Sequence, residues 1–183
     1  IDFAMKLAPF GVAALIFSVA SQLGFQIIST LLLYVLVVLT GLLIHLLVTY
    51  GAILKFIIKK NPIDFFKAIT EVIVTAFSTS SSNATLPTSM RVTSEKLNVN
   101  KDISNFVLTV GSTANQNGTA LFEGITVLFL AQFYGIDLSV GQQILVVVLS
   151  IIAGAGTAGV PGGSLPMIVM VLQTVGIPAE GIG

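Results

Sequence analysis

The sequence contains no cysteine and few charged residues. Charged side chains make up 9% of its 183 residues, against roughly 25% in an ordinary soluble domain. The lack of cysteine excludes disulfides, thiol catalysis and cysteine-bound metal within these residues. Eight basic and eight acidic residues give a net charge of zero, so no basic surface is available to bind nucleic acid.

Residue patterns typical of enzymes are also missing. The one histidine, His45, lies in an early apolar run, so no catalytic triad can be argued for Ser164. There is no His-Glu-x-x-His pattern for a zinc protease, and no Gly-Lys-Ser/Thr follows Gly156 and Gly159 as a phosphate loop requires. We therefore expect a protein that is not an enzyme and that uses no organic cofactor.

Long apolar runs replace the missing charge. Hydrophobic residues make up 55% of the chain, and the mean hydropathy is +1.01. The runs 3–23 and 27–58 are each long enough to span ~30 Å of hydrocarbon as a helix. The sequence predicts an all-α integral membrane protein that crosses a lipid bilayer several times.

The later apolar segments are interrupted at membrane depth. Residues 62–97 break at a serine-rich stretch, 101–134 at an asparagine-rich stretch, and 139–178 at a glycine-rich stretch. Irregular backbone is tolerated in a membrane only where it is buried in protein or lines a cavity, and paired broken segments mark transporter binding sites. We expect 62–97 and 139–178 to be re-entrant helical hairpins that enter from opposite faces as an inverted repeat.

The basic residues support this topology. Suppose that run 3–23 crosses the membrane from its lower side to its upper side and that run 27–58 crosses back. If 62–97 then enters and leaves from the lower side, all basic side chains lie toward the lower side. These residues are Lys6, Lys55, Lys59, Lys60, Lys67, Arg91, Lys96 and Lys101. The positive-inside rule makes this side cytoplasmic, so we expect a multi-pass protein of the cell (inner) membrane.

The serine-rich tip, residues 78–83, offers hydroxyls and the start of a half-helix near Asn83. Helix N-termini present free N–H groups and a partial positive charge, which suit an anionic carboxylate. The alternative is a serine-rich linker, which the apolar flanks on both sides disfavour.

The asparagine-rich break, Asn115 to Thr119, offers amide, carbonyl and hydroxyl oxygens of the kind that a hard cation such as sodium binds. Gly118 is expected to allow the backbone geometry that exposes them. The alternative is a kinked helix whose amides cap the freed backbone groups.

The glycine-rich tip, Gly154 to Ser164, holds five glycines and one proline in eleven residues. Such a loop is consistent with a gate whose hinges absorb dihedral change. The alternative is close helix packing through small residues.

Four further polar residues lie outside the three breaks. Glu123 is an acid at membrane depth, so it is either a proton-coupling group or a group that faces an interface or a polar cavity. His45 is expected to be a packed or hydrogen-bonded histidine in preference to a proton relay. Lys67 and Glu71, four residues apart, are expected to pair on a helix surface.

At the three breaks the sequence resembles the dicarboxylate/amino acid:cation symporter family, which includes the glutamate transporters. The matching stretches are Ser-Ser-Ser-Asn-Ala-Thr-Leu-Pro at 80–87, Asn-Gln-Asn-Gly-Thr-Ala-Leu at 115–121 and Gly-Thr-Ala-Gly-Val-Pro-Gly at 156–162. The resemblance implies that 1–24 and 26–58 are the fifth and sixth helices, 62–97 the first hairpin, 101–134 the broken seventh helix, and 139–178 the second hairpin, which acts as a gate. It also implies a homotrimer that moves a small anionic solute together with sodium ions.

The resemblance assigns residues to sites by position. The substrate would contact Ser80, Ser81, Ser82, Asn83, Thr119, Gly159, Val160 and Ser164, with Ser82 offering its backbone N–H. Cations would be bound at three sites: one at the carbonyls of Gly111 and Asn115, one at the carbonyls of Thr113, Gly154, Ala155 and Thr157, and one at Asn115 and Asn117.

This chain departs from the family pattern in the broken helix. The family usually reads Asn-Met-Asp-Gly-Thr there, whereas Gln116 and Asn117 stand here in place of methionine and aspartate. An amide is neutral, so the cation site at Asn117 lacks a charge, and protons instead of sodium stay open as the coupling ion.

The family's first helices and its eighth helix are not in the sequence, so we expect the chain to be a piece of a longer protein. The expected activity is symport of an acidic amino acid or a dicarboxylate. A neutral amino acid symporter of the same fold and an anion channel are the alternatives.

Overall fold

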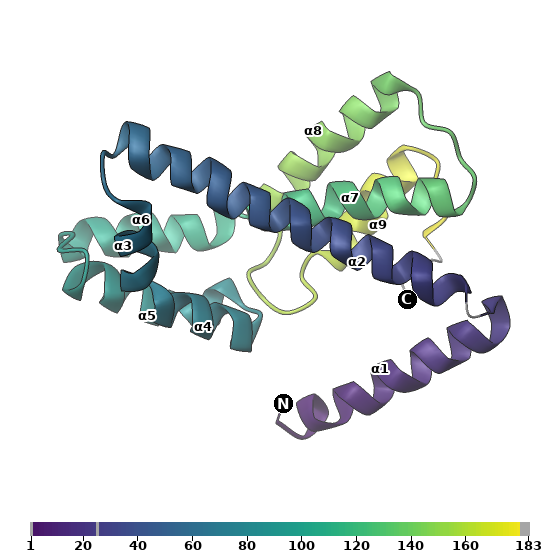
Figure 1. Cartoon of the computed structure of the whole chain (residues 1–183), viewed down its shortest axis with the longest axis horizontal. Helices are drawn as coiled ribbons and strands as arrows, with labels where there is room; N and C mark the ends of the chain where they lie inside the picture. Colours follow the sequence, from purple (N-terminus) through teal and green to yellow (C-terminus); the bar gives the residue numbers. More distant parts are fainter. Residues whose placement is uncertain (1, 25, 180–183) are drawn as a thin grey trace. The chain divides into compact units, whose positions relative to one another are not determined.

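The computed structural model describes residues 2–24 and 26–179, which are helical and contain no strand. The chain divides into two compact units, Ile1–Thr40 and Gly41–Gly183. Figure 1 follows the chain through its helices. The prediction of an all-α protein is confirmed over the described residues.

The first unit contains α1 (Asp2–Leu23) and most of α2 (Gln26–Ile44). Gly24 follows α1 with a φ of +80°, a left-handed conformation that favours glycine and ends a helix. The N–H of Ile27 bonds the carbonyl of Gly24 at 3.3 Å and so starts the next helix. Of the predicted connector at 24–26, Gly24 follows α1 and Gln26 already belongs to α2.

Two π-helical segments, η1 (His45–Tyr50) and η2 (Ile53–Ile57), continue the chain after α2. The helical run Ile27–Ile57 has 31 residues and a mean hydropathy of 2.8, and 6% of it is buried. By length and composition it is the one helix among the described residues that is long and apolar enough to cross a membrane. Since ~20 residues suffice for a perpendicular span, this helix is longer than such a span requires.

Helices α3 (Pro62–Ala68), α4 (Thr70–Thr79) and α5 (Ser82–Glu95) follow, and α4 packs against α5. The side chain of Asn61 accepts from the N–H of Ile63 at 3.0 Å, with Pro62 in the first turn, and this cap starts α3. Figure 1 shows α4 and α5 side by side, joined by a short tip.

The expected pairing of Lys67 with Glu71 is wrong. Glu71 pairs instead with Arg91 and Lys96, which α5 brings across to α4. The cause is a helix break at Ile69 (φ −93°, ψ 9°), which separates α3 from α4 and removes the regular four-residue spacing. The exposed ion pairs thus connect the two helices that flank the first tip.

The broken helix consists of α6 (Lys101–Ala114) and α7 (Asn117–Phe133). The break lies at Asn115 (φ −112°, ψ 70°) and Gln116 (φ −103°, ψ 48°). The expectation that Gly118 provides the unusual backbone geometry of the break is wrong, because Gly118 lies inside α7. A Cβ added there would make only an ordinary contact, 3.5 Å from the Leu42 side chain.

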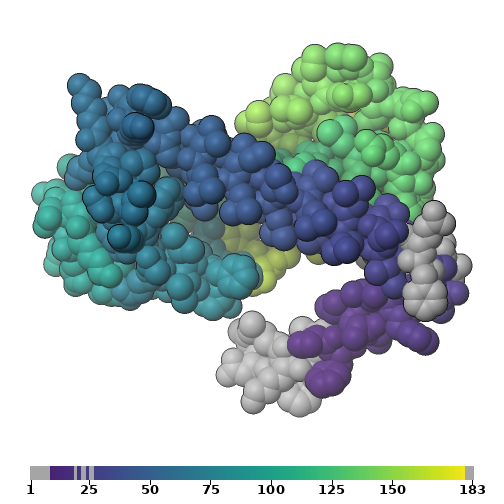
Figure 2. Space-filling view, viewed as in Figure 1, coloured from purple at the N-terminus to yellow at the C-terminus, as the bar shows by residue number. Residues whose placement is uncertain are grey.

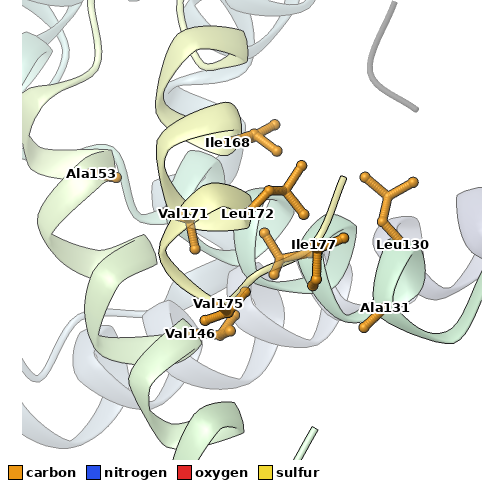
Figure 3. Close-up of a cluster of buried hydrophobic side chains, with 10 residues drawn as sticks. Leu130, Ala131, Val146, Ala153, Ile168, Val171, Leu172, Val175 and Ile177 are labelled. Atoms are coloured by element: carbon orange, nitrogen blue, oxygen red, sulfur yellow. The ribbon is translucent and has the colours of Figure 1, made fainter. Parts of the chain in front are cut away.

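The last helices are α8 (Val140–Gly156) and α9 (Leu165–Thr174). A capping box between Ser139 and Gln142 starts α8. A core of buried aliphatic side chains joins α7, α8 and α9 (Figure 3): Val127, Leu130, Ala131, Val146, Ala153, Ile168, Val171, Leu172, Val175 and Ile177.

Glycine allows the closest contact between α7 and α8. A Cβ added at Gly154 would lie 2.9 Å from the Cβ of Ala120 and 3.2 Å from its backbone nitrogen. This contact holds the start of α7 against the end of α8, and therefore fixes the broken helix relative to the glycine-rich tip.

Candidate functional site

The first tip is a two-residue turn. Ser80 has a φ of +47°, a left-handed conformation that ends α4. Ser81 is extended, and its Oγ accepts from the N–H of Ala84 at 3.2 Å, so it caps α5. The serine-rich stretch predicted as a binding tip is therefore a helix C-terminus followed at once by a helix N-terminus.

The second tip covers residues 157–164, between α8 and α9. It is held by short-range bonds, from the N–H of Val160 to the carbonyl of Ala158 at 2.8 Å and from the N–H of Gly163 to the carbonyl of Val160 at 3.0 Å. A Cβ at Gly163 would lie 2.4 Å from the carbonyl oxygen of Ala158. Glycine is therefore required at Gly163 by the turn itself.

The two tips meet at the carbonyl of Gly159. Ser81 donates its hydroxyl to this oxygen at 2.7 Å, and the backbone N–H of Asn83 donates to it at 3.0 Å. A Cβ at Gly159 would lie 2.9 Å from Asn83 Oδ1 and 3.1 Å from Ser82 Cβ. The space-filling view shows the yellow-green second tip beside the first (Figure 2). Segments 78 residues apart in sequence are thus in direct contact.

A polar cavity of about 260 Å³ lies where the tips meet. It is lined by Ala76, Ser80, Ser81, Ser82, Gln116, Thr119, Thr157, Ala158, Gly159, Val160, Gly162, Gly163 and Ser164. Seven of the eight predicted substrate residues line it. The eighth, Asn83, lies in the first turn of α5 and contacts the second tip through its backbone.

The broken helix contributes Gln116 and Thr119 to this cavity. The Gln116 amide nitrogen donates to the backbone carbonyl of Ser112 at 2.8 Å and to Ser82 Oγ at 3.3 Å. The amide oxygen of Gln116 accepts from the Thr119 hydroxyl at 3.1 Å. Gln116 therefore connects the break to the first tip.

The residues of the three predicted cation sites lie in several places in the structure. Gly111 and Asn115 line a second cavity of about 290 Å³, between α5 and α6. Asn117 and Ala155 line a third, Thr157 lines the tip cavity, and Gly154 is buried against α7. Thr113 is exposed and donates to the carbonyl of Val110.

The third cavity, about 560 Å³, is mostly apolar and lies beside η1, α7 and α8. His45 lines it and packs edge-on against Tyr50, with ring centroids 5.1 Å apart. The Asn117 amide nitrogen donates to the Tyr50 hydroxyl at 3.1 Å. His45 is thus packed as expected, although its buried Nε2 has no protein partner.

Glu123 is fully buried in α7. Its Oε1 accepts from the Thr157 hydroxyl at 3.3 Å, whereas its Oε2 has no partner. The Thr157 hydroxyl has a single proton, which it shares between Glu123 Oε1 and the carbonyl of Ala153 at 2.9 Å, and Thr157 lines the tip cavity. Glu123 is therefore one hydrogen bond away from the second tip, and it faces protein in place of an open interface.

Sequence reasoning missed two residues of the site. Gln116 was seen only as a departure from a family pattern, although its position in the break could have marked it as a cavity residue. Tyr50 carried no signal, because it lies in a long apolar helix and its contact with Asn117 is 67 residues away in sequence.

Comparison with known proteins identifies the family of this chain. The entire chain, residues 1–183, matches the sequence profile described as the sodium:dicarboxylate symporter family. This helical chain is thus part of an integral membrane protein of transporter type, and the chain belongs to the sodium:dicarboxylate symporter family.

Individual relatives agree with this assignment. The chain is 40% identical over its whole length to excitatory amino acid transporter 3 of Oryctolagus cuniculus and 41% identical to that of Bos taurus, covering 35% of each relative. It is 39% identical over 180 residues to the putative sodium-dependent excitatory amino acid transporter glt-6 of Caenorhabditis elegans, covering 97% of the chain and 33% of the relative. The chain therefore spans about a third of the length of these relatives, which are named as transporters and not as enzymes.

Proposed function

We propose that the protein to which this chain belongs is a secondary active symporter that couples sodium entry to uptake of an acidic amino acid or a dicarboxylate. The observation that carries the proposal is the meeting of two helical tips and a broken helix around one polar cavity. Membership of the sodium:dicarboxylate symporter family and similarity to sodium-dependent amino acid transporters support it.

The substrate is proposed to bind in the tip cavity. None of the side chains that line it is charged, so an anion would be held by hydroxyls and by the N-terminus of α5. The N–H groups of Asn83 and Ala84 are bonded to Gly159 and Ser81, which leaves the N–H of Ser82 for a carboxylate.

Sodium is proposed to bind at the ends of the broken helix and the second tip. Gly111 and Asn115 line one cavity, Asn117 lines a second and Thr157 lines the tip cavity, and each of these residues carries oxygen atoms. This donor set is all oxygen, as a hard cation requires. Because these oxygens are spread over separate cavities, we propose several weak cation sites, the carbonyls of Thr113, Gly154 and Ala155 included.

The arrangement in the membrane is part of the same proposal. We propose that α4–α5 and α8–α9 are re-entrant hairpins related as an inverted repeat, and that the second tip is a gate that opens by breaking the bonds to Gly159. Homotrimer assembly and a place in the cell membrane follow from the family resemblance.

Uptake of labelled aspartate into proteoliposomes containing the full-length protein tests the proposal. Accumulation that requires an inward sodium gradient supports a sodium symporter. Accumulation driven by a proton gradient alone refutes sodium as the coupling ion. Uptake that does not saturate and never exceeds equilibrium refutes symport and favours a channel.

A charge at position 117 should strengthen cation binding. We expect Asn117→Asp to raise sodium affinity or change its cooperativity, because a carboxylate attracts a cation where an amide only offers a dipole. Sodium titration of aspartate uptake measures this.

Tyr50→Phe is the matched control for that substitution. It removes the bond from Asn117 without adding charge. If Asn117→Asp leaves the sodium dependence unchanged, or changes it no more than Tyr50→Phe does, position 117 has no cation role.

A further inference from the structure

Three lysines gather where the long apolar helix ends. Lys55 lies in the last turn of η2, and Lys59 and Lys60 follow this segment. All three are exposed, and none of them forms an ion pair within the part of the chain that the structure describes. Residues 3–63 contain no acidic residue, and Asp64 is the first one that follows. This lysine cluster therefore presents positive charge that no carboxylate of the described chain binds.

The backbone at Lys59 is unusual for a lysine. Its φ is +57°, in the left-handed region, and the N–H of Lys60 bonds the carbonyl of Leu54 at 2.9 Å, which closes the helix. Glycine is the usual residue at such a position, because a Cβ strains the left-handed backbone. Lysine at this position therefore carries a backbone cost that glycine would avoid. A contact of its ammonium group outside the helix would offset that cost.

Exposed apolar side chains lie directly beside the lysine cluster. Phe56, Ile57 and Ile58 are exposed at the end of the helix, and the Lys55 ammonium lies 5.7 Å from the centre of the Phe56 ring. A lysine can lay its methylene stem along such apolar surface while its charge reaches the polar layer of a membrane. This combination of charge and apolar surface fits the boundary between acyl chains and headgroups.

We propose that Lys55, Lys59 and Lys60 form a binding site for the headgroups of anionic phospholipids, with Phe56 and Ile57 in contact with the acyl chains. A zwitterionic headgroup cancels its phosphate with its own cation, so the cluster prefers a lipid of net negative charge. The topology predicted from the sequence places this end of the helix on the cytoplasmic side, where a cell membrane holds its anionic lipids.

The site lies next to the start of the predicted first hairpin. Figure 1 shows the chain turning from the end of the long helix into α3, which begins at Pro62. A lipid bound at the lysine cluster therefore connects the bilayer surface to the first helix of this segment. The inference depends on insertion in a membrane, and not on which solute the protein carries.

The test is energy transfer between the lysine cluster and labelled lipids, in proteoliposomes that contain the full-length protein. A donor dye is attached to Ile63→Cys, an exposed position shortly after the cluster, in a cysteine-free background. The acceptor is labelled phosphatidylglycerol or labelled phosphatidylcholine. We expect a preference for phosphatidylglycerol of about fivefold or more, the gain from one lysine close to an anionic surface. Equal transfer to the two lipids overturns the inference.

Two matched double variants locate the effect. Lys59→Gln with Lys60→Gln should reduce the preference to about twofold or less. Arg91→Gln with Lys96→Gln is the control, because it also removes two cations, which already have Glu71 as a partner, and it should leave the preference unchanged. An equal fall in both double variants shows an effect of net charge and overturns the site.

Two changes of the medium identify the bound group. High salt should abolish the preference, because exposed charges are screened. Inorganic phosphate at constant ionic strength should leave it unchanged, because the proposed site binds lipid at the bilayer surface. A preference that survives high salt, or one that inorganic phosphate removes, overturns the proposal of an anionic lipid.

Lys59→Gly separates lipid binding from a role of Lys59 in ending the helix. Glycine adopts the left-handed backbone without strain, so this variant should unfold in detergent at the wild-type temperature or above, and yet lose part of the preference. Lys59→Arg should retain the preference. If Lys59 served only the helix end, through the helix dipole, Lys59→Gly would unfold at a lower temperature and keep the full preference. That result overturns the inference while leaving the proposed symport intact.

Discussion

Gly159→Val is expected to lower substrate affinity by about tenfold or more. A Cβ at this position would meet Asn83 Oδ1 at 2.9 Å, Ser82 Cβ at 3.1 Å and the Ser112 carbonyl at 3.2 Å. Two of these neighbours belong to the first tip, so a larger side chain must push the tips apart. Overpacking of this kind costs ~1–3 kcal/mol, and 1.4 kcal/mol is about tenfold in affinity. Aspartate binding to the full-length protein measures the change.

Gly156→Ala is the matched control for Gly159→Val. It lies at the end of α8, and its added Cβ would meet only the Met167 methyl at 3.9 Å, which is an ordinary contact. We expect it to bind aspartate as the wild type does. If Gly159→Val binds aspartate as tightly as Gly156→Ala, the two tips do not meet in the binding state.

Glu123→Ala is expected to destabilise the protein by about 2–4 kcal/mol. The side chain is fully buried in α7, so its removal leaves a cavity. It also removes one of the two acceptors that share the proton of the Thr157 hydroxyl at the start of the second tip, the other being the Ala153 carbonyl. Thermal unfolding of the purified full-length protein in detergent measures the loss.

Two variants separate the role of Glu123 from a general effect of losing an acid. Glu123→Gln keeps the volume and an acceptor oxygen, so it should retain most of the stability. Glu95→Ala removes an exposed carboxylate that pairs with Arg91, and it should change stability little. An unfolding temperature for Glu123→Ala equal to that of Glu95→Ala would contradict the proposed link to the second tip.

The breaks in the helices could be predicted from the sequence. Serine at 80–82 and the glycines between 154 and 163 disfavour regular helix, and both tips lie where these residues cluster. The long apolar run at 27–58 likewise predicts one continuous helix, which the structure contains over Ile27–Ile57. Local composition decides these features, because helix ends depend on residues close in sequence.

The contacts between the breaks could not be predicted from composition. Ser81 reaches Gly159 across 78 residues and Asn117 reaches Tyr50 across 67, and no periodicity specifies such pairs. The family resemblance suggested which eight residues share a cavity, and seven of them do. It could not suggest the role of Gln116, because this chain departs from the family pattern at that residue.

The prediction that Lys67 pairs with Glu71 was wrong because contacts between helices decided the partner. Four-residue spacing brings side chains together only within a continuous helix, and the chain breaks at Ile69. The packing of α5 against α4 places Arg91 and Lys96 beside the Glu71 carboxylate. Tertiary contacts decided the partner.

The central claim is that one substrate occupies the cavity between the two tips. Because the 183 residues contain no cysteine, a single thiol can be placed in the cavity at Val160, which is 48% exposed, in a cysteine-free background of the full-length protein. The most direct measurement is the rate at which a thiol reagent modifies Val160→Cys with and without aspartate and sodium. The account predicts that aspartate with sodium slows modification several-fold, and that Val148→Cys, exposed on α8 outside the cavity, is unaffected. Equal rates at Val160→Cys with and without ligand would contradict it.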